Sequence, residues 1–285
     1  MPNITRLIRS LTFVPSNNKR FLIKACTLQT DVVCLDLEDS IPNDQKSKAR
    51  CMAAQSLAES HMGRVFVRTN SPDSKTIPQD IEEVLRPGLA GLVIPKVDSA
   101  QQLEDIISLL DKLESRLKLP KTALIPSIES ALGAVNCYQI ASCSERIEAV
   151  VFGVFDLLAD LYTEYEPNSP AAAYARAKIP LEARAARVPA IDAIWQDTKD
   201  EAGLERDSLV ARSLGYAGKC VIHPDQLPII HKIFKPTKAE IEWANKVCQA
   251  YERSVQESGR GAVTIDGKMV DEVHYKYASK LLETI

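Results

Sequence analysis

The sequence predicts an α/β protein built as a (β/α)8 TIM barrel with a C-terminal helical and lid extension. Three observations support this fold class. Short apolar runs and helix-like stretches alternate eight times, which is the number of β-then-α units in such a barrel. Several of the runs are rich in Val and Ile, as is typical of strands buried on both faces. The first βα turn carries no glycine-rich dinucleotide fingerprint, which argues against the main rival, an open doubly wound sheet.

The eight units can be placed along the chain from the apolar runs and the helix signals between them. In chain order, we expect strands at 11–15, 32–37, 64–68, 91–95, 123–128, 149–153, 190–195 and 219–222. The helices between and after them are expected at 18–28, 44–59, 78–85, 100–117, 131–141, 170–186, 203–214 and 225–233. Ser99 and Ser130 are suited to be N-caps, and Pro42 and Pro78 stand where helices can begin.

The last fifty or so residues are more than a barrel needs. A helix is expected from about 237 to 257, then a Gly-rich turn at 258–261, a segment at 263–269 and a last helix over 270–282. We therefore divide the chain into a barrel, residues 1–235, and a C-terminal extension with a lid, residues 236–285. A packed extension, a lid and an arm exchanged between subunits all fit this segment.

Composition and charge exclude several classes of protein. The 285 residues include 35 Lys and Arg against 38 Asp and Glu, so the net charge is −3 and a nucleic-acid-binding surface is not expected. No apolar run approaches the ~18 residues of a membrane span. The seven cysteines form no CxxC pair, which favours reduced thiols that pack like small apolar side chains. A cytoplasmic enzyme is the default expectation.

Charged residues gather at the expected carboxyl ends of the strands, where barrel enzymes place their active sites. In strand order these residues are 36–39, Arg68, Lys96, Glu129, Asp156, Asp192 and His223. We expect them to meet at one mouth of the barrel.

Glu129 and Asp156 are the candidate metal ligands. They follow adjacent parallel strands, so their carboxylates are expected to lie close together, and a hard divalent cation would relieve their repulsion. Two protein oxygens leave the other positions of Mg²⁺ for water and substrate oxygens, and Gly153 allows a close backbone approach. In the alternative interpretation, Glu129 is a first-turn helix residue and Asp156 is an N-cap.

Three further side chains have both a catalytic and a structural interpretation. Arg68 ends a buried strand, where its planar fork suits a carboxylate or an enolate oxygen, or an ion pair with Glu38 or Asp39. Lys96 is a candidate Schiff-base lysine, but the carboxylates nearby favour a charged ammonium in an ion pair. His223 is a candidate general base or a cap for the helix that follows. The chain has no HExxH, GxSxG or P-loop motif.

Ten short motifs in a consistent order and spacing complete the pattern. They lie at 9–15, 36–40, 67–70, 94–96, 128–133, 152–157, 190–192, 215–219, 222–226 and 266–271. With these motifs nearly the whole chain resembles the citrate lyase β-subunit-like family, which includes malyl-CoA and citramalyl-CoA lyases. That family lies within the aldolase superfamily of phosphoenolpyruvate-binding barrels.

The resemblance implies the cofactor and a set of barrel residues. Glu129 and Asp156 would hold Mg²⁺, and Arg68 would contact substrate oxygens. Glu38 would lie in the same pocket as a catalytic residue, with Gly153 beside the substrate.

The resemblance also implies roles at the two ends of the chain. The motif around Arg9 would lie near the CoA-binding face, and Asp271 would act as general acid/base beneath a mobile lid, in the site of a neighbouring subunit. A homotrimer or homohexamer is therefore expected. Three features depart from the family pattern: Val273 stands where a proline is common, the stretch 162–170 is unusual, and family glycines are missing near Ser16, Tyr162 and Arg187.

The activity implied is a Mg²⁺-dependent carbon–carbon lyase. It would cleave or form a β-hydroxyacyl-CoA, such as malyl-CoA or citramalyl-CoA, with a 2-oxo acid and an acyl-CoA as products. Three alternatives remain open: a CoA-independent pyruvate or oxaloacetate aldolase, an acyl-CoA thioesterase at the same metal site, and a non-catalytic partner subunit. Because of the departures from the family pattern, the resemblance does not fix the acyl substrate or the use of CoA.

Overall fold

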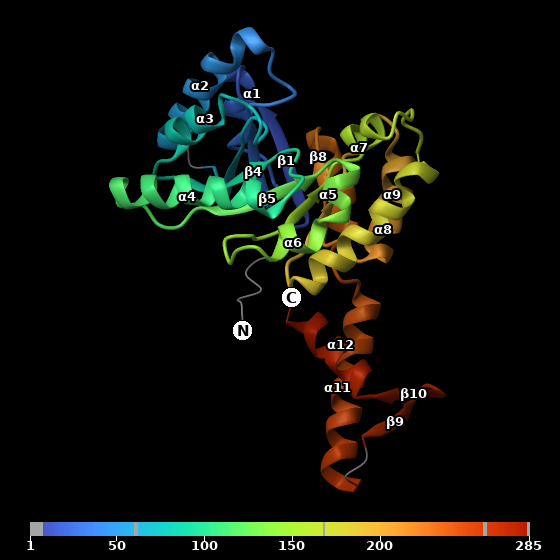
Figure 1. Ribbon diagram of the computed structural model, residues 1–285. Coiled ribbons are helices and arrows are strands. Elements are labelled where there is room, and N and C mark those ends of the chain that lie inside the picture. Colours follow the sequence, from blue (N-terminus) through green and yellow to red (C-terminus); the bar gives the residue numbers. More distant parts are fainter. Residues whose placement is uncertain (1–7, 60–61, 168, 259–260, 284–285) are drawn as a thin grey trace. The chain divides into compact units, whose positions relative to one another are not determined.

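The structure, a computed structural model, describes residues 8–59, 62–167, 169–258 and 261–283. The chain divides into two compact units, Met1–Lys232 and Ile233–Ile285. In the first unit, eight parallel strands close into a barrel in the order β1 to β8, with β8 paired to β1 (Figure 1). The predicted (β/α)8 barrel is confirmed.

All eight strands fall on predicted apolar runs. They are β1 (Ser10–Pro15), β2 (Val32–Asp36), β3 (Val65–Arg68), β4 (Leu89–Ile94), β5 (Ala123–Ile128), β6 (Val150–Phe152), β7 (Ala190–Asp192) and β8 (Gly218–Val221). β6 and β7 are shorter than predicted, because the chain leaves the ladder after Phe152 and Asp192 to build the segments at the barrel mouth.

Apolar side chains from the strands fill the barrel interior. Phe66 is fully buried there, and Gly91 on the neighbouring strand leaves room for its ring, since a Cβ at Gly91 would lie 2.2 Å from Phe66 Cε1. Cys34 and Cys220 are buried in the same core as free thiols. Burial raises the pKa of Cys220 to about 12, so this thiol stays protonated and packs as a small apolar group.

Ten α-helices in the described part of this unit connect the strands and surround the barrel (Figure 1). They are α1 (Lys19–Ala25), α2 (Lys46–Glu59), α3 (Ile77–Val84), α4 (Ala100–Leu117), α5 (Ala131–Val135), α6 (Cys137–Ser142), α7 (Val154–Asp160), α8 (Pro170–Ala185), α9 (Glu201–Leu214) and α10 (Leu227–Ile233). The predicted N-caps are confirmed, because the Ser99 and Ser130 side chains accept from the backbone N–H groups of Gln102 and Gly133.

Three helix predictions need correction. The helix expected at 131–141 is two helices, because the backbone leaves helical geometry at Asn136, whose side-chain amide donates to the carbonyl of Asp98. The seven-residue α7 was not predicted, since so short a segment carries little periodicity. The helix expected at 225–233 begins with a 3₁₀ turn, Pro224–Gln226, which His223 caps by accepting from Asp225 N. The capping interpretation of His223 is confirmed.

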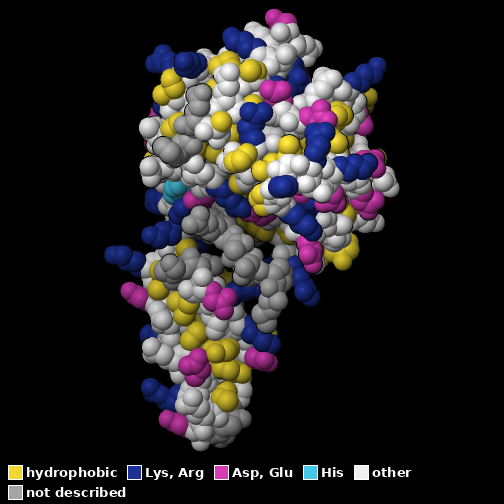
Figure 2. All heavy atoms as spheres, turned by 90° about the vertical axis from the view of Figure 1, so that its left-hand side faces the viewer, with side chains coloured by type: hydrophobic (Ala, Val, Ile, Leu, Met, Phe, Trp, Pro, Cys, Tyr) yellow, Lys and Arg dark blue, Asp and Glu magenta, His cyan; other side chains and the backbone are white. Residues whose placement is uncertain are grey.

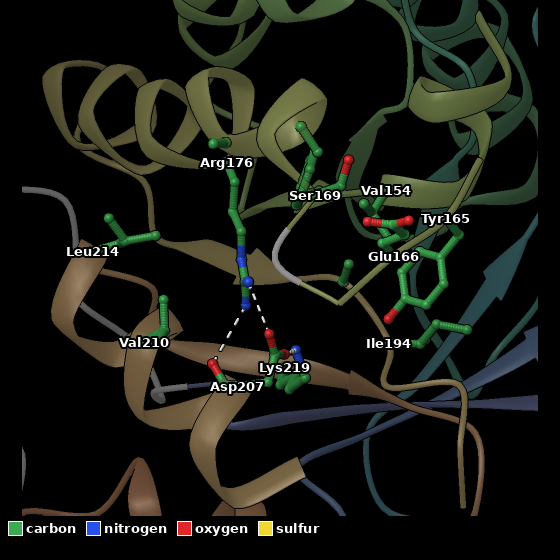
Figure 3. Close-up of a pocket in the computed structure, with 14 residues that line it drawn as sticks. Val154, Tyr165, Glu166, Ser169, Arg176, Ile194, Asp207, Val210, Leu214 and Lys219 are labelled. Carbon is green, nitrogen blue, oxygen red and sulfur yellow. Dashed lines mark hydrogen bonds and ion pairs between the residues drawn. The ribbon is translucent and has the colours of Figure 1, made fainter. Parts of the chain in front are cut away.

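A buried ion network ties two outer helices to the barrel. Lys219 of β8 donates to Asp192 of β7 and to Asp207 of α9, both at 2.5 Å. Arg176 of α8 pairs with the same two carboxylates at 2.7 and 2.8 Å. Figure 3 shows Arg176 reaching from its helix toward Asp207 and Lys219. Asp192 therefore belongs to this network, and its expected place among the charges of the mouth is wrong.

The second unit has its own small core. A long helix, α11 (Lys238–Ser258), packs against a hairpin, β9 (Ala262–Ile265) and β10 (Lys268–Asp271), and against α12 (Glu272–Leu282). Ala244, Val247, Val270 and Ala278 are buried between them. The hairpin turn is Asp266-Gly267 with φ values of 48° and 76°, as a two-residue hairpin turn requires.

The start of the last helix also differs from the prediction. It was expected at 270, but Val270 and Asp271 pair with Val263 and Ala262 of β9. Asp271 then caps α12, so the helix begins at Glu272.

Charged side chains are mixed over the surface shown in Figure 2, where Lys and Arg alternate with Asp and Glu. Among the described residues, no helix combines the length and the apolar character needed to cross a bilayer.

We expect Lys219→Met to lower the free energy of unfolding by about 3–5 kcal/mol, because it removes the buried cation and leaves Arg176 alone to compensate two buried carboxylates. Urea unfolding measures the change. The matched control is Lys232→Met, whose exposed ion pair with Glu205 is expected to contribute less than about 1 kcal/mol. Equal effects of the two substitutions would contradict a stabilising role for the network.

Candidate active site

The carboxyl ends of the strands form one mouth of the barrel, and five predicted site residues meet there. Glu38 follows β2, Arg68 ends β3, Lys96 follows β4, Glu129 follows β5 and Asp156 lies in α7 after β6. These five strands are hydrogen-bonded neighbours in that order, so their ends lie next to one another along the rim. The ion pairs described below join four of these side chains, and Glu129 lies close enough to Asp156 to be affected by its charge.

Arg68 is held by Asp36, its direct neighbour across the sheet. The two residues form the last pair in the register between β2 and β3. Arg68 Nε donates to Asp36 Oδ1 at 2.6 Å and Nη2 donates to Oδ2 at 2.8 Å, a bidentate pair. Ser40 Oγ and the backbone N–H of Glu38 also donate to Asp36. Glu38 and Asp39 were the predicted partners of Arg68, and Asp36 was missed, although its place at the end of β2 was the available signal.

The guanidinium of Arg68 is charged and fixed. Its carbon Cζ lies 4.6 Å from the centre of the Phe13 ring of β1, and its Nη1 lies 3.0 Å from Glu38 and 3.5 Å from Asp39. Burial opposes the charge, but Asp36 outweighs it and raises the pKa of Arg68 well above its usual value. The side chain is 13% exposed, so it touches the mouth without being free to move.

Lys96 bridges three carboxylates at the rim. Its Nζ lies 2.7 Å from Glu38, 3.3 Å from Asp39 and 3.3 Å from Asp156. Burial lowers its pKa, but the hydrogen bond to Glu38 and the negative charges of the three carboxylates together outweigh burial, so the net pKa is raised. A charged ammonium is not a nucleophile, so the structure supports the ion pair and not the Schiff base. The backbone at Lys96 has φ = 53°, a strained conformation of the kind found at functional sites.

Glu129 is a buried carboxyl with a free oxygen. It precedes the N-cap Ser130 of α5, so it is not the first-turn helix residue of the alternative interpretation. Among the described residues, nothing hydrogen-bonds to its Oε2. Burial, and next to it the negative charge of Asp156, raise the pKa of Glu129 to about 7 against a hydrogen bond from Ser127. The group therefore lacks a cationic partner of its own.

Gly153 provides the space in which the Glu129 side chain lies. A Cβ at this position would lie 2.4 Å from Glu129 Cγ and 3.0 Å from its Cδ, so any larger residue would displace the carboxyl. Gly153 is also the N-cap of α7, and Asp156 lies in the first turn of that helix rather than at its cap. The alternative interpretation of Asp156 as an N-cap is therefore wrong.

The residues present fit a hard divalent cation. Glu129 and Asp156 repel each other, and the free Oε2 of Glu129 is a ready ligand. Among the described residues, no cluster of three or more His, Cys, Asp or Glu side chains is arranged for a metal. A cation here would take two carboxylates and fill its shell with water or substrate oxygens, which is how Mg²⁺ is usually held in enzymes.

One predicted site residue, Arg9, is not brought to this cluster. Arg9 precedes β1 at the opposite end of the barrel, where it pairs with Asp31 through bonds of 2.9 and 2.7 Å. Asp271 belongs to the second unit, where it caps α12. Ser16, which directly follows β1, was not predicted to be a site residue. Its Oγ is buried in the mouth region without a hydrogen-bond partner among the described residues.

Comparison with known proteins gives a consistent result. A family model described as HpcH/HpaI aldolase/citrate lyase matches residues 9–224. Citrate lyase subunit beta of Escherichia coli K12 is 34% identical over 271 residues, which are 94% of this chain and 89% of that protein. A (3S)-malyl-CoA thioesterase of Cereibacter sphaeroides is 33% identical over 276 residues, 96% of this chain and 93% of that one.

Solved structures agree with the sequence matches. Protein CitE of Mycobacterium tuberculosis, crystallised with magnesium, acetoacetate and coenzyme A, has a TM-score of 0.78 at 28% identity and covers 97% of both chains. The citrate lyase beta subunit from the same organism, complexed with oxaloacetate and magnesium, has a TM-score of 0.69 at 26% identity and covers 82% of this chain and all of its own.

The raised pKa of Glu129 predicts a pH-dependent stability in metal-free protein. An ordinary glutamate in the unfolded chain ionises near pH 4.3, whereas Glu129 ionises at about 7 in the folded state. Below about pH 4.3 the carboxyl is protonated in both states, and its ionisation does not affect the free energy of unfolding. Between about pH 4.3 and about pH 7 the buried carboxyl increasingly destabilises the folded state, and above about pH 7 the destabilisation is complete. We expect Glu129→Gln to gain roughly 3 kcal/mol in unfolding free energy, relative to the unchanged chain, on going from pH 4.5 to pH 8.

Urea unfolding in EDTA at the two pH values measures this difference. The exposed Glu145 offers a control, since Glu145→Gln should leave the pH dependence of the unchanged chain as it was. A Glu129→Gln curve parallel to that of the unchanged protein would refute the assignment of a buried, uncompensated carboxyl.

Proposed function

The chain belongs to the HpcH/HpaI aldolase/citrate lyase family, and from this premise we propose that it is a Mg²⁺-dependent carbon–carbon lyase acting on a β-hydroxyacyl-CoA such as malyl-CoA or citramalyl-CoA. The observation that carries the proposal is the carboxylate pair Glu129 and Asp156 beside the fixed guanidinium of Arg68. The magnesium, oxo acid and coenzyme A bound by the M. tuberculosis relatives support the same ligand classes here.

Glu129 and Asp156 would hold the metal. When bound, Mg²⁺ supplies a Lewis acid for the carboxylate and hydroxyl oxygens that become the 2-oxo acid. Gly153 keeps the space beside Glu129 open, and Lys96 offsets part of the negative charge of Asp156. The two carboxylates thus orient the oxo-acid half of the substrate.

Arg68 would stabilise the half of the substrate that becomes the acyl-CoA. Cleavage of the bond between the hydroxyl-bearing carbon and the α-carbon leaves its electron pair as a thioester enolate. A guanidinium that is fixed before the reaction stabilises that developing oxyanion, an effect worth about 3–4 kcal/mol per donor. The guanidinium has five N–H groups. Asp36 accepts from Nε and from one hydrogen of Nη2, and Glu38 contacts Nη1, so N–H groups remain to donate to the enolate oxygen. Glu38 orients both Arg68 and Lys96.

Asp271 would carry the proton. In the cleavage direction its carboxylate takes the hydroxyl proton as the carbon–carbon bond breaks, and it returns a proton to the enolate carbon to give the acyl-CoA. The proposal includes a homotrimer or homohexamer in which the C-terminal unit acts as a lid over a neighbouring subunit. Arg9, paired with Asp31, takes no part in these steps.

Thioester hydrolysis is the second candidate, because a relative of 33% identity is named a (3S)-malyl-CoA thioesterase. The same metal and Arg68 would then polarise the thioester carbonyl for attack by water. Hydrolysis yields a free dicarboxylic acid and CoA, whereas the lyase yields a 2-oxo acid and an acyl-CoA.

Mass spectrometry of the products from malyl-CoA and citramalyl-CoA separates these activities. We expect a 2-oxo acid and an acyl-CoA with Mg²⁺, and loss of turnover by at least about 100-fold in Arg68→Ala and Asp156→Ala. Both variants should remain folded by circular dichroism. Turnover that survives EDTA would count against the metal, and free CoA with malate would assign the thioesterase. Activity on free hydroxy acids alone would assign a CoA-independent aldolase.

A second prediction concerns the space beside Glu129. We expect Gly153→Ala to weaken Mg²⁺ binding by about 10-fold or more in calorimetry, because the added methyl displaces the Glu129 carboxyl. Gly63→Ala is the matched control, since a Cβ there meets nothing within 4 Å. The same Mg²⁺ affinity in both variants would show that Glu129 is not a ligand.

A further inference from the structure

Asp271 and His274 form a close pair at the start of α12. The distance between Asp271 Oδ1 and His274 Nδ1 is 2.7 Å, and the two side chains are 37% and 43% exposed. The backbone N–H groups of Val273 and His274 donate to the same Oδ1 at 3.1 and 3.4 Å. Among the described residues, Oδ2 of Asp271 receives no hydrogen bond, so the two oxygens have different surroundings.

The short distance assigns the proton of the imidazole. An ionised carboxylate only accepts hydrogen bonds, so a contact of 2.7 Å requires a hydrogen on His274 Nδ1. The longer contact of 3.3 Å from Asp271 N to the same nitrogen would need an unprotonated Nδ1. The two hydrogen bonds exclude each other, and the shorter one is the stronger. His274 therefore donates to Asp271, and the carboxylate keeps its second oxygen free.

We infer that His274 is a positioning residue for the proton-transfer carboxylate: its Nδ1–H holds Oδ1 of Asp271 so that Oδ2 is presented to exchange the proton. The inference rests on the role proposed above for Asp271. Without the imidazole, Oδ1 keeps only the two longer bonds from the backbone N–H groups, so the carboxylate is held less firmly. A displaced reacting atom is costly in rate.

The electrostatics of the second unit agree with this geometry. The hydrogen bond from His274 comes first among the causes that hold the pKa of Asp271 below its ordinary value. Two pairs of charged groups on the elements around Asp271 and His274 contact each other: Lys246 with Asp266, and Glu272 with Lys276. Lys268 lines the same small cavity as His274 and Asp266. His274 is thus the direct partner of the carboxylate.

Asparagine and leucine at position 274 separate the hydrogen bond from the rest of the ring. The side-chain N–H of Asn stands near the position of Nδ1, so His274→Asn keeps a donor for Oδ1, whereas His274→Leu removes it. We expect His274→Leu to lower kcat about 10- to 100-fold with KM within about twofold, and His274→Asn to keep kcat within about threefold.

The pH profile tests the pairing itself. Asp271 acts as a base when ionised, so at saturating Mg²⁺, which keeps Glu129 ionised, the acid limb of kcat/KM lies at the pKa of Asp271 in the free enzyme. Loss of the hydrogen bond raises that pKa, and the limb should therefore move to higher pH in His274→Leu and stay in place in His274→Asn. A purely structural role for His274 would lower activity at all pH values without moving the limb.

A readout without turnover separates this inference from the proposed function. The side-chain carboxyl carbon of Asp271 is titrated by NMR in the full chain and assigned by its loss in Asp271→Asn. We expect its midpoint to rise in His274→Leu and to stay unchanged in His274→Asn. The same midpoint in all three proteins overturns the inference, as does a normal kcat in His274→Leu. Absence of lyase activity in the unchanged protein refutes the proposed function, while the titration still decides the pairing.

Discussion

The bidentate pair between Asp36 and Arg68 is the interaction on which the mouth of the barrel depends. It joins the last residues of two adjacent strands, so the position of the guanidinium follows from the sheet register and not from a loop. A cation held in this way keeps its charge and direction before any ligand arrives, which is the condition for stabilising an oxyanion without reorganisation. Glu38 and Lys96 are then arranged around it by further ion pairs.

The rest of the mouth is shaped by an excess of negative charge. Five carboxylates lie at the rim, and they outnumber the cations that contact them: Asp36, Glu38, Asp39, Glu129 and Asp156. Because there are too few cations, Glu129 is left as a buried carboxyl without a cationic partner among the described residues. A divalent cation offsets such an excess, and this makes the acidic mouth and the proposed metal parts of one arrangement.

The second unit fixes the orientation of Asp271. Its core of small apolar residues folds a hairpin directly onto a helix start, and Asp271 lies at that junction. The same carboxylate ends a strand, caps a helix and pairs with an imidazole, so its orientation is set by three independent constraints. A proton-transfer group benefits from this kind of preorganisation.

The sequence by itself determined the barrel, the eight strands, the caps Ser99 and Ser130, and the acidic residues after the strands, because periodicity and cap chemistry are local properties. It also indicated Glu129 and Asp156, since parallel strands place their ends at one rim. Only the tertiary structure decided which charges meet. Three pairings depend on strand register and helix packing: Asp36 with Arg68, Asp192 with Lys219, and Arg9 with Asp31 at the other end of the barrel. Ion pairs between residues distant in sequence leave no periodic trace, so they emerge only when the chain has closed on itself.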